Sequence, residues 1–110
     1  MSLQSRAARP LSGPLSPMSD NIMNAPHGMN LVVECNDGSA VIGRFDESNG
    51  FEVVMHDVDL WESDQGSAEE RENWVRSTAT YGVAVKERDH RFSARLVERW
   101  RPLGDIEKLS

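Results

Sequence analysis

Three short segments in the first half of the chain alternate apolar with polar residues, which is the pattern of half-buried β-strands. They span residues 31–35, 39–45 and 51–58. An Asn-Asp-Gly triplet (36–38) and the stretch DESNG (46–50) separate them, and both are typical of tight turns because Gly and Asn tolerate positive φ. The pattern predicts an antiparallel three-stranded meander. Its expected core residues are Val33, Val41, Phe45, Val53 and Met55.

The middle of the chain is more polar than the three predicted strands. Residues 62–73 (ESDQGSAEEREN) are polar and acidic. Ser67 and Glu70 have the spacing of a capping box, which begins helices, so a two-turn helix and a solvated loop both fit, and the loop is favoured. Residues 74–85 (WVRSTATYGVAV) return to residues that favour β-structure, and we expect a strand there.

Residues 90–100 (HRFSARLVERW) fit two structures. Alternation along a strand would point Phe92, Ala94, Leu96 and Trp100 inward. A helix would place Phe92, Leu96 and Trp100 at i, i+4 and i+8, with Pro102 as its stop. The strand is favoured because a three-stranded meander needs further strands to close it. We therefore expect a mainly β fold, with an α+β fold carrying a C-terminal helix at 90–100 as the alternative.

The stretch from residue 31 to residue 58 resembles the first motif of Sm-like proteins. The elements that carry the resemblance are Asp37-Gly38 at the first turn, Gly43-Arg44-Phe45 at the end of the second strand, and Asp46 and Asn49 before a third apolar strand. SH3-like and Tudor-like barrels and some small phage joining proteins share this order. The resemblance implies a small five-stranded SH3/Sm-like barrel, and RNA binding if the chain is Sm-like. Gly43 inside its strand independently predicts a bend or bulge.

The barrel domain is expected at residues 29–105, between two tails. Residues 1–28 are predicted to be a disordered N-terminal tail, because the first twenty are rich in Ser, Pro and Arg and lack an apolar period. Residues 106–110 form the predicted C-terminal tail. Arg6 and Arg9, with no acid before Asp20, also suit an organellar transit peptide. A cytoplasmic location is expected, with an organellar one as the alternative.

Composition narrows the class of protein. The single cysteine, Cys35, excludes an internal disulfide and favours a reducing compartment. No stretch approaches the roughly 18 apolar residues that cross a membrane. The net charge of −6 is uneven: residues 30–72 carry twelve acids and two arginines, whereas residues 73–110 have a balance of +3. The overall acidity opposes non-specific nucleic-acid binding, while the basic end is compatible with RNA or an acidic partner.

The sequence predicts neither an enzyme nor a metal protein. Cys35, His56 and Asp57 are the residue types of a nucleophile, a base and an orienting acid, but alternation assigns Cys35 to the core and His56 to the surface. The acids between residues 57 and 72 lack the register of a cation-binding loop. We therefore expect no catalytic residue, no metal site and no small-molecule cofactor.

The candidate binding residues are aromatic or basic. Trp61, beside several acids, is the tryptophan expected to be exposed, whereas Trp74 and Trp100 are expected to fill the core. A basic stripe on the face opposite Phe92 would suit phosphates or an acidic partner, and a solvated edge strand is the alternative interpretation. The stripe consists of Arg91, Arg95, Arg99 and Arg101.

These residues predict a non-catalytic interaction module. It would bind a protein partner or self-associate as a homo-oligomer through its acidic and basic faces. An Sm-like RNA-binding protein is the first alternative, and a phage-type structural joining protein is the second. No membrane partner is expected.

Overall fold

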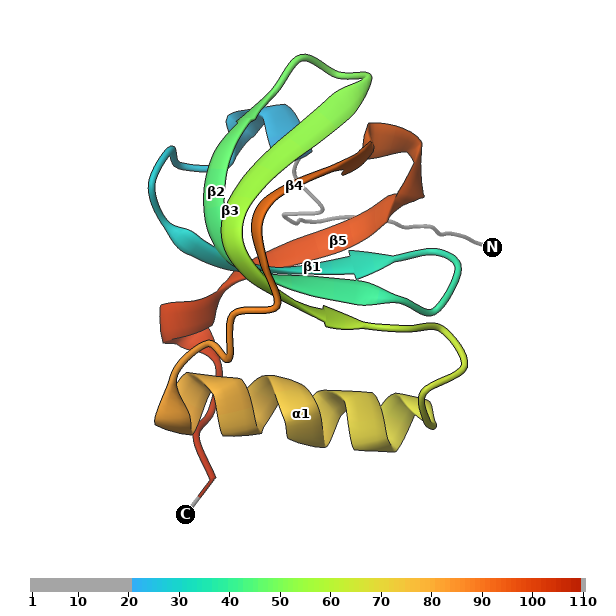
Figure 1. Cartoon of the computed structure of the whole chain (residues 1–110), viewed down its shortest axis with the longest axis vertical. Coiled ribbons are helices and arrows are strands. Elements are labelled where there is room, and N and C mark those ends of the chain that lie inside the picture. The colour runs from blue at the N-terminus through green and yellow to red at the C-terminus, as the bar shows by residue number, and fades with distance from the viewer. Residues whose placement is uncertain (1–20, 110) are drawn as a thin grey trace, which may run out of the picture.

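The computed structural model describes residues 21–109 of the chain as one five-stranded antiparallel sheet with a helix (Figure 1). The strands follow the order β4-β3-β2-β1-β5 across the sheet. Their bounds are β1 (Asn30–Cys35), β2 (Ala40–Ser48), β3 (Glu52–Trp61), β4 (Glu87–Ser93) and β5 (Val97–Pro102). Helix α1 (Ala68–Tyr81) connects β3 to β4, and short 3-10 turns stand at η1 (Ile22–Asn24), η2 (Ala94–Leu96) and η3 (Leu103–Asp105). The mainly β fold is confirmed.

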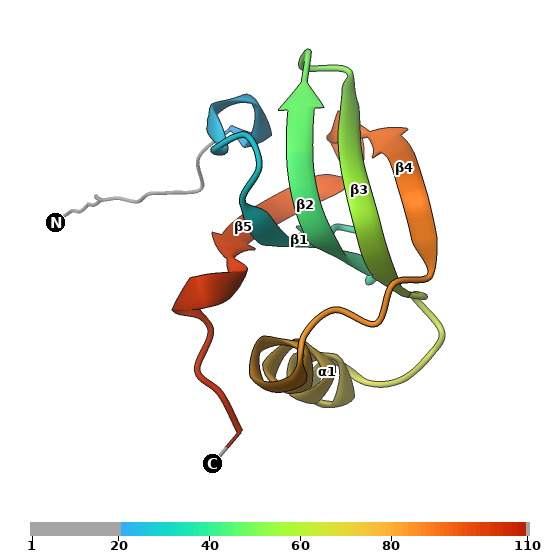
Figure 2. The ribbon, with the colours of Figure 1, turned by 60° about the vertical axis from the view of Figure 1, so that its left-hand side comes forward.

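The sheet bends strongly about the middle of β2, and α1 lies across its outer side (Figure 2). The pairing of β2 with β3 shifts register on either side of the bend, between Ile42 and Arg44 and again between Phe45 and Glu47. A Cβ on Gly43 would come within 2.5 Å of the Val58 side chain and 2.9 Å of the His56 carbonyl oxygen. Only glycine permits this approach, so the predicted bend at Gly43 is confirmed. Within residues 21–109 the sheet keeps two edges, at β4 and β5.

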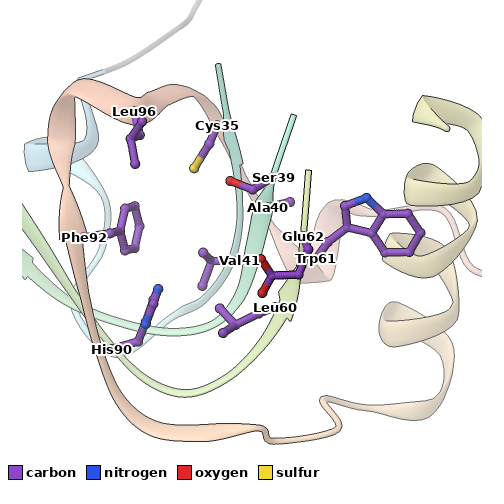
Figure 3. A pocket seen from close by; sticks show the side chains of 10 residues that line it. All are labelled: Cys35, Ser39, Ala40, Val41, Leu60, Trp61, Glu62, His90, Phe92 and Leu96. Atoms are coloured by element: carbon purple, nitrogen blue, oxygen red, sulfur yellow. The ribbon is translucent and has the colours of Figure 1, made fainter. Parts of the chain in front are cut away.

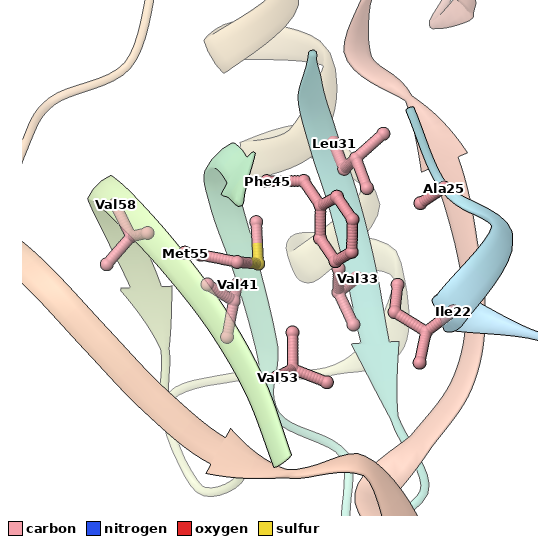
Figure 4. Packing of buried hydrophobic residues seen from close by; sticks show 9 residues of the cluster. All are labelled: Ile22, Ala25, Leu31, Val33, Val41, Phe45, Val53, Met55 and Val58. Atoms are coloured by element: carbon pink, nitrogen blue, oxygen red, sulfur yellow. The ribbon is translucent and has the colours of Figure 1, made fainter. Parts of the chain in front are cut away.

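The concave face of the sheet encloses the main hydrophobic core (Figure 4). All five residues predicted for the core of the meander belong to it. The complete cluster is Ile22, Ala25, Leu31, Val33, Val41, Phe45, Val53, Met55 and Val58. Phe92, Ala94, Val97 and Trp100 pack against it from β4, η2 and β5. The last two strands thus complete the burial that the meander alone lacks.

A second, smaller cluster forms between the outer face of the sheet and α1. Val32 and Ile42 contribute from β1 and β2, and Val75 from α1 contacts them, joined by Ile106. Strand β1 is therefore covered on both sides, which explains why every residue from Leu31 to Cys35 is buried. A strict alternation of buried and exposed positions holds only where one face meets water.

Helix α1 occupies residues 68–81, so the favoured loop holds only for residues 62–67, and the strand predicted at 74–85 is wrong. The capping box is present: the Ser67 side chain accepts from the Glu70 amide, and the Glu70 carboxylate accepts from the Ser67 amide. Gly82 ends the helix with a φ of 97°. Val75 and Thr78, three residues apart, form its buried face. Tertiary burial of this narrow face prevailed over the β-propensity of residues 74–81. No helix within residues 21–109 is long and apolar enough to cross a membrane.

Residues 90–100 form neither one strand nor a helix. Strand β4 ends at Ser93, whose side chain accepts a hydrogen bond from the Arg95 amide and starts the 3-10 turn η2. Strand β5 begins at Val97 and pairs with β1. The fourth and fifth strands are therefore residues 87–93 and 97–102, not 74–85 and 90–100. The turn η2 changes the direction of the chain between β4 and β5. The period of apolar residues does not reveal such a change.

The packed region extends beyond residues 29–105 at both ends. Ile22 and Ala25 are buried in the main core, so order begins before Met29. At the other end Ile106 is buried against α1, and Arg76 donates to the Glu107 carbonyl oxygen. Residues 1–20, the larger part of the predicted disordered tail, lie outside the described residues.

Replacing Val53 with Asp tests the arrangement of the core. Val53 is fully buried among apolar side chains, so the aspartate would carry a charge with no partner. We expect a loss of about 5 kcal/mol, comparable with the whole stability of a small domain, and therefore no cooperative thermal transition by circular dichroism. Phe51→Asp, at an exposed neighbouring position, adds the same charge and serves as the control. A normal melt for Val53→Asp would contradict this core.

Candidate functional site

The structure buries Trp61, contrary to the expectation that it is exposed. Its side chain is 8% exposed, and its ring lies 5.5 Å from the ring of Trp74 on α1. Trp74 in turn donates from Nε1 to the Asp59 carboxylate at 3.0 Å. The indole of Trp61 points towards the helix (Figure 3). The two tryptophans therefore attach α1 to the sheet.

The predicted arginine stripe is divided between the two edge strands of the sheet. Arg91 lies on β4 and pairs with Glu52 of β3 at 3.2 Å. Arg95 is exposed on η2, and its carbonyl oxygen accepts from the Asn36 side chain. Arg99 and Arg101 lie on β5, on the side of the sheet that α1 covers. The turn η2 separates Arg91 from Arg99 and Arg101. The four arginines therefore do not form the single basic surface that one strand or one helix would have given.

Glu34 on β1 collects three arginines at the junction of the sheet and α1. Its side chain is 7% exposed. Arg99 donates from Nε at 2.9 Å and Arg101 from Nη2 at 2.6 Å, both to Glu34 Oε2. Arg71 of α1 reaches Oε1 at 3.3 Å and also donates to the Gly38 carbonyl oxygen. Arg101 binds Glu72 as well. A buried carboxylate held by several charge-assisted hydrogen bonds is a structural connector.

His56 on β3 lies between two carboxylates near the outer end of β4. Its Nε2 is 2.9 Å from Asp46 and its Nδ1 is 2.8 Å from Asp89. The hydrogen bonds to Asp46 and then to Asp89 raise the pKa of His56 above its ordinary value. The hydrogen bond from His56 lowers the pKa of Asp46 in the same way. Both ring nitrogens thus contact carboxylates, so His56 connects β2, β3 and β4.

Cys35 lies in a different environment from His56. The Cys35 side chain is 3% exposed. Burial raises the pKa of its thiol, which disfavours the reactive thiolate at neutral pH. Within residues 21–109 no cluster of His, Cys, Asp and Glu has the arrangement of a metal site.

A pocket of about 230 Å³ opens on the concave side of the sheet (Figure 3). His90, Phe92 and Leu96 line one side, from β4 and η2, and Cys35, Val41 and Leu60 line the other. The walls are mainly apolar. The polar groups are Ser39, Glu62 and His90, and the His90 Nδ1 atom is 2.9 Å from Glu87. A small concave site with apolar walls and a few polar groups has the form of a binding site.

Sequence reasoning did not find this pocket. Its two walls come from residues 35–62 and residues 90–96, which are distant in the chain. Only the bend at Gly43 and the corner at η2 bring them face to face. The one signal in the sequence was the inward face predicted for Phe92 and Leu96, which both line the pocket, while Phe92 also packs against the main core.

Comparison with known proteins gives no family for this chain. No protein-family model matches it. No curated protein matches it at significant similarity. Any function proposed for this chain therefore depends on the geometry of the structure.

Removal of the Glu34 carboxylate should weaken the attachment of α1 and β5. Glu34→Ala leaves three guanidinium groups around a vacated, largely dry position. We expect a loss of about 3 kcal/mol, the lower end for a broken buried pair, because Arg99 is half exposed and regains water. Urea denaturation measures it. Glu47→Ala, an exposed acid on β2, is the matched control and should change stability by about 0.5 kcal/mol or less. Equal midpoints for the two variants would contradict the connector role.

His56 should make stability depend on pH. Because its pKa is higher in the folded chain, its contribution is complete below the unfolded pKa and is lost as pH rises through the folded pKa. The melting temperature should therefore fall more steeply between about pH 6 and about pH 9 in the natural chain than in His56→Gln. His27, whose Nδ1 atom contacts Asp46 and whose side chain is 79% exposed, provides the control His27→Gln. Parallel curves for the natural chain and His56→Gln would contradict this role.

Proposed function

We propose that this chain is a non-catalytic interaction module that binds a segment of a protein partner in the concave pocket. The observation that carries the proposal is the composition of the pocket walls. Val41, Leu60, Phe92 and Leu96 supply apolar surface, while Glu62 and His90 supply polar groups beside it. A volume of about 230 Å³ suits one or two aliphatic side chains better than a cofactor.

The edge of β4 supports an extended protein segment as the ligand. One edge of β4 pairs with β3, and no strand within residues 21–109 pairs with the other. His90 and Phe92 of this same strand line the pocket. An extended segment that adds to a free strand edge gains backbone hydrogen bonds and places alternate side chains in an adjacent pocket. The charged sequence of β4 also restricts unspecific pairing at that edge.

The finer fold that we propose is a small barrel of the SH3-like or Sm-like kind. Five strands in one bent antiparallel sheet, with a glycine at the bend, support it. The single buried cysteine supports a reducing, cytoplasmic location. A phage-type joining protein would be a special case of the same interaction function. RNA binding has less support, because Arg91, Arg99 and Arg101 are already paired with acids of the fold.

Selection of peptides on the intact chain tests the proposal. A library of random linear peptides displayed on phage should yield sequences that bind the natural chain and share an aliphatic residue. Leu96→Arg places a long charged side chain at the pocket wall, on a partly exposed residue, and should weaken the selected peptides at least about tenfold, or about 1.4 kcal/mol. Arg88→Leu, at an exposed position of β4 outside the pocket lining, is the control.

Two results would count against the proposal. Selected peptides that bind Leu96→Arg as tightly as the natural chain would locate binding elsewhere. A library that yields no binder would remove the support for an extended ligand. Circular dichroism of Leu96→Arg confirms in parallel that this variant remains folded.

A further inference from the structure

The outer edge of β4 carries backbone groups that no strand within residues 21–109 uses. Strand β4 borders the sheet, with β3 on its inner side (Figure 2). The Ala94 amide donates to the Phe51 carbonyl oxygen at 2.9 Å, in continuation of the ladder between β3 and β4. Hydrogen-bonded pairs alternate along an antiparallel ladder, so Phe92, two residues before Ala94, also directs its N–H and C=O groups towards β3. Asp89 and Arg91 occupy the alternate positions and direct theirs towards the free edge.

Two opposite charges stand beside this edge. Asp89 and Arg91 alternate with the two residues of β4 that line the pocket, so their side chains lie on the opposite face of the sheet. The Asp89 side chain is 79% exposed and that of Arg91 is 66% exposed. Asp89 contacts His56, and Arg91 contacts Glu52. A carboxylate accepts several hydrogen bonds and a guanidinium donates several, so both side chains have capacity for partners beyond the edge.

These charges make the edge of β4 complementary to itself. When two antiparallel copies of β4 pair about a two-fold axis at His90, Asp89 of each copy lies opposite Arg91 of the other. A shift of the register by two residues places either Asp89 opposite Asp89 or Arg91 opposite Arg91. Opposite charges stabilise a cross-strand pair and like charges destabilise it. The register centred on His90 is therefore preferred over both of its neighbours.

The other positions of this register place no two residues of like formal charge opposite each other. Glu87 lies opposite Ser93, and Arg88 lies opposite Phe92, whose ring face attracts a cation. His90 meets its own copy at the axis. Its Nδ1 atom is 2.9 Å from the Glu87 carboxylate of the same strand, which offsets the charge of the ring when it is protonated.

The other edge of the sheet, at β5, is less open than that of β4. The turn η1 contacts β5, and its residue Ile22 is buried in the main core. Strand β4 is therefore the better edge for the addition of a further strand.

We propose that a second copy of this chain pairs with the free edge of β4, antiparallel and about a two-fold axis at His90. The two sheets then form one, and an ion-pair network crosses the junction. It runs from Glu52 and Arg91 of one copy to Asp89 and His56 of the other. Two-fold pairing uses the same surface on both copies, so association ends at the dimer. The inference goes beyond the proposed function, because the second copy and an external segment compete for the same edge.

Reversal of single charges tests the register. Sedimentation equilibrium of the full chain between about 10 µM and about 1 mM should show monomers and dimers, because a short ladder is a small interface. Arg91→Asp sets aspartates opposite each other, and Asp89→Arg does the same with arginines. Each variant alone should dimerise at least about tenfold more weakly than the natural chain. An equimolar mixture of the two should recover the natural affinity to within about threefold, because every aspartate then faces an arginine.

A matched control separates this effect from a change of net charge. Glu47→Arg, at an exposed position of β2, changes the net charge by the same amount as Asp89→Arg and should dimerise as the natural chain does. Thermal melts by circular dichroism confirm in parallel that the variants remain folded.

Amide hydrogen exchange gives a second readout, which reports on the backbone. The Asp89 and Arg91 amides bond to the second copy in the dimer, so they should exchange about threefold or more slowly at 1 mM than at 10 µM. The Phe92 amide faces β3 in both states and should exchange at the same rate at both concentrations.

Four results would overturn the inference. A mass of one copy at about 1 mM would exclude the dimer and leave the proposed function standing. A mass above two copies would indicate pairing of β4 with the β5 edge of another copy. Variants that dimerise as tightly as the natural chain, or a mixture that fails to recover, would locate the contact elsewhere. A dimer that passes these tests while no peptide can be selected supports the inference and refutes only the proposed function.

Discussion

The close approach of β2 and β3 at Gly43 is the constraint on which the rest of the structure depends. A side chain at this position would occupy the space of Val58 and of the His56 carbonyl oxygen. With glycine at this position, the register between β2 and β3 shifts on both sides of the bend, and the sheet curves strongly. This bend turns one face of the meander into an enclosed core, and it carries β4 round until His90 and Phe92 stand opposite Cys35 and Val41. The enclosed core and the pocket therefore both depend on glycine at position 43.

Several of the arginines in the basic part of the chain pair with acids of the fold. Residues 30–72 are acidic and residues 73–110 are basic, and the fold pairs several of their opposite charges. Glu34 takes Arg99 and Arg101, Glu52 takes Arg91, and Asp59 lies 3.7 Å from Lys86. These pairs hold β5, β4 and the connection to α1 in position. Asp37, Glu62 and Asp64 take part in no ion pair within the described part of the chain, and Glu62 lines the pocket.

The pocket and the free edge of β4 lie side by side on the surface that we propose for binding. Strand β4 is held firmly on one side, through its ladder with β3 and through His56, which joins Asp46 and Asp89. Its other side is free within residues 21–109 and borders the pocket. A rigid strand that presents an open edge loses little entropy on binding. This combination supports our proposal that the molecule binds an extended segment of a protein partner.

The sequence by itself determined the meander, its turns, the bend at Gly43 and the inward face, because these depend on neighbours in the chain and on the period of the strand. The capping box of α1 was also visible in Ser67 and Glu70, but β-favouring residues after Trp74 masked the helix that it began. Only the tertiary structure decided the rest. Helix α1 is stabilised because Val75 packs on the outer face of β1 and β2. Trp61 is buried because Trp74 packs against it. Arg99 and Arg101 became structural because Glu34, far away in sequence, lies beside them. A local pattern specifies which face of a strand is apolar; which other segment covers that face, and which charges meet there, depends on contacts between residues that the chain keeps far apart.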